Sequence, residues 1–366
     1  MRVLVAMSGG VDSSVVAALL HEQGHEVVGA TLQLYDHGAA APARAGSCCA
    51  GQDIHDARNV ADRIGIPHYV LDRESRFRDA VIADFADSYA RGETPIPCVR
   101  CNQTVKFTDL VLLGRDLGCE ALATGHYAQQ VEGPDGPELH RAADAERDQS
   151  YFLFATTRAQ LALARFPLGG MASKAEVRGH AERLGLPVAA KPDSQDICFV
   201  PSGTYRETVA RLRPDAAEAG DVVHVDGRVL GRHDGVARFT VGQRRGLGAA
   251  SRDGDAAMAV VSVDAGRRRI VVGPRGSLPV AEAEAGEVNW LIPPPRGAFA
   301  AMAKFRAREV PRPVVAAWDE AAGLLRVKAE TPAIIAPGQA LVLYDGDRVL
   351  GGGFLRPHVD RTEVAA

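Results

Sequence analysis

Residues 2 to 24 carry the feature that most constrains the fold of this chain. Residues 2–7 form a short apolar run rich in branched side chains, which is typical of a buried parallel strand. Residues 15–20 are good helix formers, and Gly24 is a normal helix stop. The connecting stretch, Ser8-Gly9-Gly10-Val11-Asp12-Ser13-Ser14, would aim free backbone N–H groups and the positive end of the helix dipole at one point. That point favours a phosphate.

The glycine spacing in this stretch excludes two common nucleotide motifs. It matches neither the Gly-x-x-x-x-Gly-Lys-Ser/Thr P-loop nor the Gly-x-Gly-x-x-Gly dinucleotide fingerprint. Ser-Gly-Gly-x-Asp-Ser-Ser instead resembles the pyrophosphate loop of the ATP pyrophosphatases. Those enzymes split ATP between its α and β phosphates and adenylylate an acceptor oxygen. The alternative, a purely structural turn, is disfavoured by the number of matching positions between a strand and a helix.

The order of elements predicts three domains. Strands and helices alternate through residues 1–205, which indicates an α/β domain with a Rossmann-like parallel sheet, similar to the adenine-nucleotide α-hydrolases. Short strands and tight turns then predict a small mainly-β middle domain over residues 206–278 and a C-terminal β-barrel over residues 279–366. Within the first domain, two prolines predict a loop over residues 94–102, and residues 121–131 are predicted as one strand interrupted by Thr-Gly-His.

Charge is distributed unevenly along the chain. The net charge is −4 from 42 Lys+Arg and 46 Asp+Glu; residues 201–366 hold 23 of the basic and 20 of the acidic residues, hence +3, which leaves −7 for residues 1–200. Basic clusters at residues 243–245, 267–269 and 304–308 permit a phosphate-backbone partner, although ordinary solvated surface explains each of them as well. No apolar run is long enough to span a membrane, and the N-terminal strand leaves no room for a signal peptide. We therefore expect a cytoplasmic protein.

Three cysteines in polar, proline-flanked settings stand out. Cys98 and Cys101 precede a predicted helix, whose N-terminus lowers thiol pKa, and Cys198 lies near the end of the α/β domain. A Cys-x-x-Cys pair could be a redox pair or half of a zinc or cluster site, and buried structural thiols are the plainer alternative. Cys119 fits an apolar core, and the pair Cys48-Cys49 is interpreted as an idle surface pair.

Seven motifs in order identify a closer resemblance over nearly the whole chain. The motifs are SGGVDSS, PCVRCNxxxKF, ATGHYA, RDQSYFL, KPDSQDICFVP, GQRRGLG and PGQALVLY. With these motifs the chain resembles the tRNA-specific 2-thiouridylases, and the second and fifth motifs are absent from other pyrophosphate-loop proteins. The resemblance implies that ATP adenylylates the carbon-2 oxygen of a tRNA wobble uridine and that a cysteine persulfide then supplies sulfur, releasing AMP.

The resemblance also assigns site residues. Cys101 corresponds to the nucleophile and Cys198 to the persulfide-bearing cysteine, and Asp12 would help to hold Mg²⁺ or cap the helix. The residues implied to bind ATP are Ala6, Met7, Ser8, Gly9, Gly10, Val11, Asp12, Ser13, Leu32 and Gly125. Those implied to meet the target base are Ile96, Pro97 and Cys98. Those implied to contact tRNA are His126, Arg147, Asp148, Gln149, Lys304, Phe305 and Gln339.

One departure from the family pattern leaves the sulfur chemistry open. Some members carry aspartate where this chain has Cys98, so Cys98, Cys101 and Cys198 could together hold a [4Fe–4S] cluster instead of relaying a persulfide. The sulfur donor would be a cysteine desulfurase, a persulfide carrier or sulfide. Two other functions stay open: a pyrophosphate-loop enzyme that amidates or ligates a small metabolite, and a non-catalytic, nucleotide-regulated RNA-binding protein.

Overall fold

The computed structural model describes residues 1–35, 50–193, 197–200, 205–254 and 256–357, so the pair Cys48-Cys49 lies outside the described residues. The chain divides into two compact units. The first comprises Met1–Ile82, Cys98–Ser202 and Asp347–Val349, and the second comprises Ala83–Pro97, Gly203–Gly346 and Leu350–Ala366. In the described part of the chain, no helix has the length and apolar character needed to cross a bilayer.

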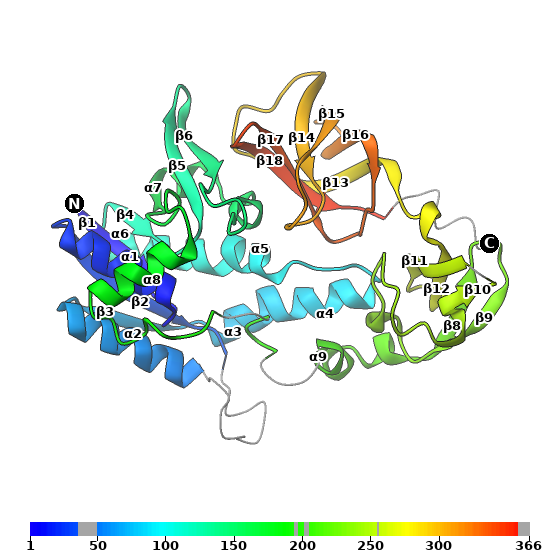
Figure 1. Cartoon of the computed structure of the whole chain (residues 1–366), viewed down its shortest axis with the longest axis horizontal. Coiled ribbons are helices and arrows are strands. Elements are labelled where there is room, and N and C mark those ends of the chain that lie inside the picture. Colours follow the sequence, from blue (N-terminus) through cyan, green and yellow to red (C-terminus); the bar gives the residue numbers. More distant parts are fainter. Residues whose placement is uncertain (36–49, 194–196, 201–204, 255, 358–366) are drawn as a thin grey trace. The chain divides into compact units, whose positions relative to one another are not determined.

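The first unit is built on a parallel sheet with the strand order β3-β2-β1-β4-β7 (Figure 1). The central strand β1 pairs in parallel with β2 on one side and β4 on the other. Two flanking strands complete the sheet. The bounds are β1 (Arg2–Ala6), β2 (Glu26–Gln33), β3 (His68–Asp72), β4 (Ala121–Ala123) and β7 (Ala164–Arg165). The predicted α/β class is therefore confirmed.

Both faces of this sheet are covered because β1 is apolar at every central position. Val3 and Val5 belong to a core cluster with helices α1, α2 and α8. Leu4 points the opposite way and lies against Gly114 of α6, as the alternation of strand side chains requires. The bounds are α1 (Val11–Glu22), α2 (Ala50–Ile64), α6 (Phe107–Asp116) and α8 (Lys174–Arg183). Smaller elements are α7 (Arg158–Leu163) and the hairpin of β5 (Ala128–Gly133) and β6 (Gly136–Arg141).

Two local predictions in this unit are wrong. Residues predicted as a loop over 94–102 include the helix α5 (Pro97–Cys101), which continues as the π-helical turn η2 (Asn102–Lys106) into α6. Pro97 is the first residue of α5, a position where proline is favoured because no intrahelical partner for its N–H is needed. Residues 121–131 form two strands rather than one, because the chain leaves the parallel sheet after β4 and enters the β5–β6 hairpin.

The second unit is mainly β, and its described residues include the α-helices α4 (Ala83–Ala90) and α9 (Tyr205–Leu212). One sheet has the order β10-β11-β12-β8-β9, and a second closes into a barrel in the order β13-β16-β15-β14-β17-β18 through the pairing of β13 with β18. The small middle domain and the C-terminal barrel that we expected are thus both present. Strand bounds are β8 (Gly220–His224), β9 (Val229–His233), β10 (Arg252–Asp253), β11 (Ala256–Asp264), β12 (Arg269–Pro274), β13 (Val280–Trp290), β14 (Ala298–Lys304), β15 (Arg312–Asp319), β16 (Leu324–Ala333), β17 (Ala340–Asp345) and β18 (Arg348–Leu355).

Candidate active site

The turn between β1 and α1 has the backbone geometry of an anion site. Gly9 has φ +74°, and a Cβ at this position would lie 2.2 Å from the carbonyl oxygen of Asp53, so only glycine fits. Gly10 is the N-cap residue of α1, and within the described ranges no side chain caps this end of the helix. The amides of the first helical turn are therefore available to a ligand at the positive end of the helix dipole.

Serine side chains fix the shape of this turn. The Ser8 N–H donates to Oγ of Ser13 over 3.1 Å, and the Ser14 hydroxyl donates to the Gly10 carbonyl over 2.8 Å. Because these bonds form within the turn, its conformation is set before a ligand arrives. The residues present thus fit the phosphate chain of ATP.

The structure brings Gly125 to the same turn from the carboxyl end of β4. A Cβ on Gly125 would lie 2.9 Å from the Ser13 nitrogen. Leu32 lies on β2, two residues beyond Ala30, the partner of Ala6 at the end of β1. Leu32 therefore lies near the carboxyl end of β2 and Gly125 just beyond that of β4, at the edge of a parallel sheet where ligands bind.

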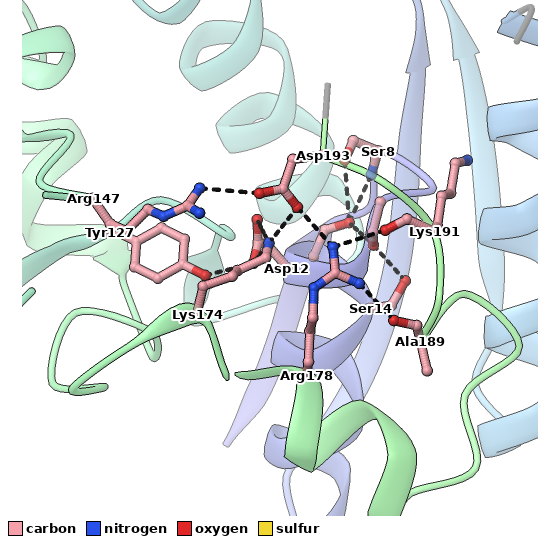
Figure 2. A network of polar contacts seen from close by, with 12 residues as sticks. Ser8, Asp12, Ser14, Tyr127, Arg147, Lys174, Arg178, Ala189, Lys191 and Asp193 are labelled. Carbon is pink, nitrogen blue, oxygen red and sulfur yellow. Dashed lines mark hydrogen bonds and ion pairs between the residues drawn. The ribbon is translucent and has the colours of Figure 1, made fainter. Parts of the chain in front are cut away.

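Asp12 is the centre of a polar network that sequence reasoning did not find (Figure 2). Its carboxylate accepts a hydrogen bond from the Tyr127 hydroxyl over 2.7 Å and two from Nζ of Lys174 over 2.7 and 2.8 Å. The same Nζ lies 2.9 Å from Oδ1 of Asp193. In the sequence, two features could have pointed to this network. Asp193 belongs to the KPDSQDICFVP motif, and Lys174 follows Ser173, a good helix N-cap.

Asp12 fits Mg²⁺ only as a single protein ligand. Among the described residues, no group of three or more His, Cys, Asp or Glu side chains is arranged to hold a metal ion. Mg²⁺ is commonly held by one carboxylate together with substrate phosphates and water, so Asp12 beside the anion site is compatible with it. Asp12 would first have to give up part of its contact with Lys174.

A second lysine holds the outer side of the turn. Nζ of Lys191 donates to the Gly9 carbonyl over 3.0 Å and to Asp53 and Asp56 of α2 over 2.7 and 2.5 Å. Burial lowers the pKa of Lys191, but its hydrogen bonds with the two carboxylates outweigh burial and leave the pKa raised. Lys191 therefore stays charged and ties the glycine turn to α2.

The three candidate cysteines belong to the first unit, and all of them are free thiols. Cys98 and Cys101 lie one helical turn apart on α5, with Cys98 exposed and Cys101 buried. Burial raises the pKa of Cys101, partly offset by Lys106. Cys198 is an exposed residue, unlike Cys101. Burial of its sulfur nevertheless raises the pKa of Cys198, and the nearby Cys101 and Cys98 raise it further. The three sulfurs thus lie within electrostatic reach of one another, and Cys101 and Cys198 are protonated at neutral pH.

Apolar side chains surround the Cys101 end of this group. Cys101 shares a buried cluster with Phe77 and Val105, and Tyr35 and Phe199 pack against it. The rings of Phe77 and Phe199 meet edge to face at 5.7 Å. Phe199 follows Cys198 directly, so this contact holds the Cys198 end of its motif against the apolar cluster that contains Cys101.

Several residues implied to contact tRNA have internal partners here. Asp148 accepts hydrogen bonds from the amides of Ala142 and Ser150, and Oε1 of Gln149 accepts one from the Tyr127 amide. Of the three neighbours, Arg147 has the exposed side chain, and it pairs with Asp193 at 3.0 Å. Contact with tRNA stays a prediction for all three, with Arg147 the residue best placed to reach a phosphate.

The residues of the second unit that are predicted to contact tRNA also have partners within the protein. Lys304 and Phe305 are buried, at 3% and 1% exposure, and Nζ of Lys304 lies 5.6 Å from the centre of the Tyr344 ring. Gln339 donates to the Thr94 carbonyl over 2.9 Å. Of the residues implied to meet the target base, Ile96 is buried and Cys98 is exposed. These contacts with tRNA are untested and stay predictions.

His126 is held as a neutral ring. Its Nδ1 lies 2.8 Å from the Thr124 hydroxyl, and its ring stacks on Phe107 at 6.3 Å and meets Phe166 edge-on. Burial lowers the pKa of His126 well below its usual value, and the charge of Lys106 lowers it further. A neutral imidazole cannot attract an RNA phosphate by charge.

We expect the pKa of His126 to show in the pH dependence of stability. Because the unfolded chain binds a proton near pH 6.5 and folded His126 does not, its contribution is constant above that pH and is lost as pH falls below it. His126→Gln should therefore lose less stability between pH 7.5 and 5.5 than the parent, measured by urea unfolding. His55→Gln, at an exposed position on α2, is the control. Equal losses in parent and His126→Gln, or an NMR titration of the His126 ring at pH 6.5, would contradict the expectation.

Comparison with known proteins identifies the domain families and the relatives of the chain. A model for a tRNA methyl transferase HUP domain matches residues 1–202, a tRNA methyl transferase PRC-barrel domain matches residues 207–274, and an aminomethyltransferase β-barrel domain matches residues 280–355. The chain is 65% identical over 355 residues to the tRNA-specific 2-thiouridylase MnmA of Acidiphilium cryptum, covering 97% of this chain and 100% of that protein. It is 60% identical to the same enzyme of Gluconobacter oxydans, covering 97% and 99%.

Fold and site together define a protein with a HUP-type nucleotide-binding domain followed by two β domains. Within that class, the chain belongs to the tRNA-specific 2-thiouridylase family. The resemblance found in the sequence motifs is thereby confirmed.

Proposed function

We propose that this protein is an ATP-dependent tRNA-uridine 2-sulfurtransferase that converts the wobble uridine of tRNA to 2-thiouridine. The observation that carries the proposal is the presence, in one compact unit, of an uncapped glycine turn suited to phosphate and of three thiols in mutual electrostatic reach. Family membership supports the substrate, because the most similar relatives named above are tRNA-specific 2-thiouridylases.

The first step activates the base. A uridine carbonyl oxygen is a poor leaving group, so the oxygen at carbon 2 attacks the α-phosphorus of ATP and pyrophosphate leaves. The N–H groups of residues 9–13 would hold the phosphate chain and stabilise the developing charge. Bound Mg²⁺, held by Asp12, would offset further phosphate charge. The target base would have to be unstacked to reach this site.

The second step transfers sulfur. A persulfide on Cys198 ionises more readily than a thiol; its terminal sulfur attacks carbon 2, and AMP leaves with the former uridine oxygen. Cys101 must then lose its proton, and its thiolate attacks Sγ of Cys198, which breaks the S–S bond to the transferred sulfur and leaves it on carbon 2. A Cys101–Cys198 disulfide forms, and an external thiol must reduce it before the next cycle. A persulfide carrier or cysteine desulfurase would transfer sulfane sulfur to the Cys198 thiolate. Free sulfide would instead attack Sγ of Cys198 in the Cys101–Cys198 disulfide, which forms the Cys198 persulfide and releases Cys101 as a thiol.

The iron–sulfur alternative rests on the number of thiolates. Cys98, Cys101 and Cys198 could each bind one iron of a [4Fe–4S] cluster, although in the described residues they do not form a group that could hold a single metal ion. We favour the persulfide relay, in which Cys98 is not needed.

We also propose a division of labour along the chain. Residues 1–205 would carry the chemistry, residues 206–278 would form a spacer domain, and residues 279–366 would contribute to tRNA binding. The basic segment at residues 304–308 supports this role for the barrel through Arg306 and Arg308, since Lys304 and Phe305 are buried. RNA recognition by such side chains rests mainly on phosphate contacts.

One assay tests the proposal against its competitors. Incubated with ATP, Mg²⁺, total tRNA and either a persulfide donor or, in a parallel reaction, sulfide, the protein should yield 2-thiouridine and an equivalent amount of AMP. AMP formation that does not depend on tRNA would favour a metabolite ligase, and tRNA binding without AMP would favour a non-catalytic binder. Absence of thiolated nucleoside both in air and under anaerobic conditions would reject the proposal.

A further inference from the structure

All three N–H donors of Lys174 face carboxylate oxygens of two residues. An ammonium group has three N–H donors, and Nζ of Lys174 lies 2.7 and 2.8 Å from the two oxygens of Asp12 and 2.9 Å from Oδ1 of Asp193. Its side chain is 11% exposed and lies along the ring of Tyr127, 6.0 Å from the ring centre. Lys174 is thus a nearly buried cation with every donor occupied.

The place of Lys174 in the fold points to a ligand. It is the first residue of α8, and its side chain reaches Asp12, in the first turn of α1, next to the uncapped Gly10. A phosphate chain bound at this turn would bring several negative charges beside the ammonium group. If Asp12 turns toward Mg²⁺, as proposed above, two N–H donors of Lys174 become available for phosphate oxygens.

Asp193 is itself held from two further directions. Its Oδ1 accepts from Arg178 over 3.2 Å and its Oδ2 from Arg147 over 3.0 Å (Figure 2). Arg178 is in turn fixed by the carbonyls of Ala189 and Lys191, over 2.8 and 3.0 Å. A carboxylate fixed in this way keeps Lys174 beside the turn when Asp12 releases it.

We propose that Lys174 is a phosphate-binding residue of the ATP site and that Asp193 is the positioning residue that holds it there. In the nucleotide-free protein, Lys174 neutralises Asp12; with ATP and Mg²⁺ bound, Asp12 contacts the metal ion and Lys174 exchanges Asp12 for phosphate. This inference rests on the proposed function, because it assumes ATP as the ligand of the turn.

The test measures binding rather than turnover. Titration calorimetry with Mg²⁺ and α,β-methylene-ATP, which cannot be split at the α–β bond, would be compared with adenosine. Lys174→Met should weaken the triphosphate analogue roughly tenfold or more, the effect of losing a charge-assisted hydrogen bond, and leave adenosine within about twofold. Lys174→Arg should restore most of the affinity. Arg183→Gln is the matched control, since Arg183 is on the same helix but pairs with Glu22 at the surface.

Asp193→Asn separates the positioning role from a general loss of structure. Without this carboxylate, Lys174 keeps Asp12 as its partner, so triphosphate affinity should fall roughly fivefold with adenosine affinity unchanged. Unchanged triphosphate affinity in Lys174→Met, or an equal loss for adenosine in a variant that melts like the parent, would overturn the inference. A parent protein that binds no analogue would instead reject the proposed function.

Discussion

Replacing either Cys101 or Cys198 with serine is expected to reduce tRNA thiolation at least about a thousandfold, because a hydroxyl can neither carry sulfane sulfur nor release it. Formation of AMP should persist in both variants, since adenylylation uses the glycine turn rather than the thiols. Thiolated nucleoside and AMP would be quantified in the same reaction. Cys119→Ser is the matched control, because Cys119 lies in β1–α6 packing beside Gly114 and takes no part in the proposed chemistry.

The same series decides the role of Cys98. In a persulfide relay, Cys98→Asp should retain activity within about threefold, whereas a cluster with three thiolate ligands would lose one of them and its iron. Iron and acid-labile sulfide would be measured after anaerobic purification of the parent and of Cys98→Asp. Full activity in Cys101→Ser would contradict the relay. If the parent contained stoichiometric iron and Cys98→Asp lost it, the cluster mechanism would be favoured over the relay.

Gly9→Ala is expected to have the second large effect, the loss of ATP binding. At φ +74° an L-residue is strained, and here its Cβ would also meet the Asp53 carbonyl at 2.2 Å, so the backbone of the turn must move. We expect affinity for the ATP analogue to fall roughly a hundredfold or more, since displacement of the turn removes several backbone donors together. The measurement is the titration already described, together with a thermal unfolding curve.

Gly24→Ala provides the control for backbone strain alone. Gly24 has φ +83°, close to that of Gly9, but a Cβ there would meet nothing within 4 Å. Its cost should be about 1–2 kcal/mol of stability with no change in affinity. If both alanine variants bound the analogue like the parent, the turn would not be the phosphate site.

The parts of the site that could be predicted from the sequence are those that short segments determine. The turn at residues 8–14 was predictable because its strand, glycines and helix are contiguous, and the fold class followed from the alternation of elements through residues 1–205. The thiols were predictable because their flanking motifs are distinctive. None of these predictions required knowledge of which distant segments meet.

The network around Asp12 could not be predicted for that reason. Lys174 reaches Asp12 across 162 positions, and Lys191 reaches Gly9 across 182. Lys191 opens the motif KPDSQDICFVP, but no local pattern shows that either lysine reaches the glycine turn. The resemblance gave Asp148 and Gln149 a role toward tRNA, whereas their hydrogen bonds to nearby backbone amides become visible only in three dimensions.

The secondary-structure errors have equally specific causes. Two prolines predicted a loop around Cys98, but Pro97 occupies the one helical position where proline is favoured. The strand β13, 11 residues long, is hard to predict from the sequence because glycine and alternating charge, AEAEAGE, hide its apolar face. That face appears only when the barrel is closed and Ala283 and Ala285 are buried in its core.

The π-helical turn η2 sets the direction in which the cysteine pair points. The α6 helix beyond it is anchored by buried Asp109, which pairs with Arg73 and Arg76 at 3.1 and 2.9 Å. Each residue added to or removed from a helix rotates everything before it by about 100°. The wider turn over Asn102–Lys106 therefore changes the direction in which Cys98 and Cys101 point relative to the anchored helix α6. A chain that kept every cysteine but lost one residue from this turn would present the pair to a different side of the molecule.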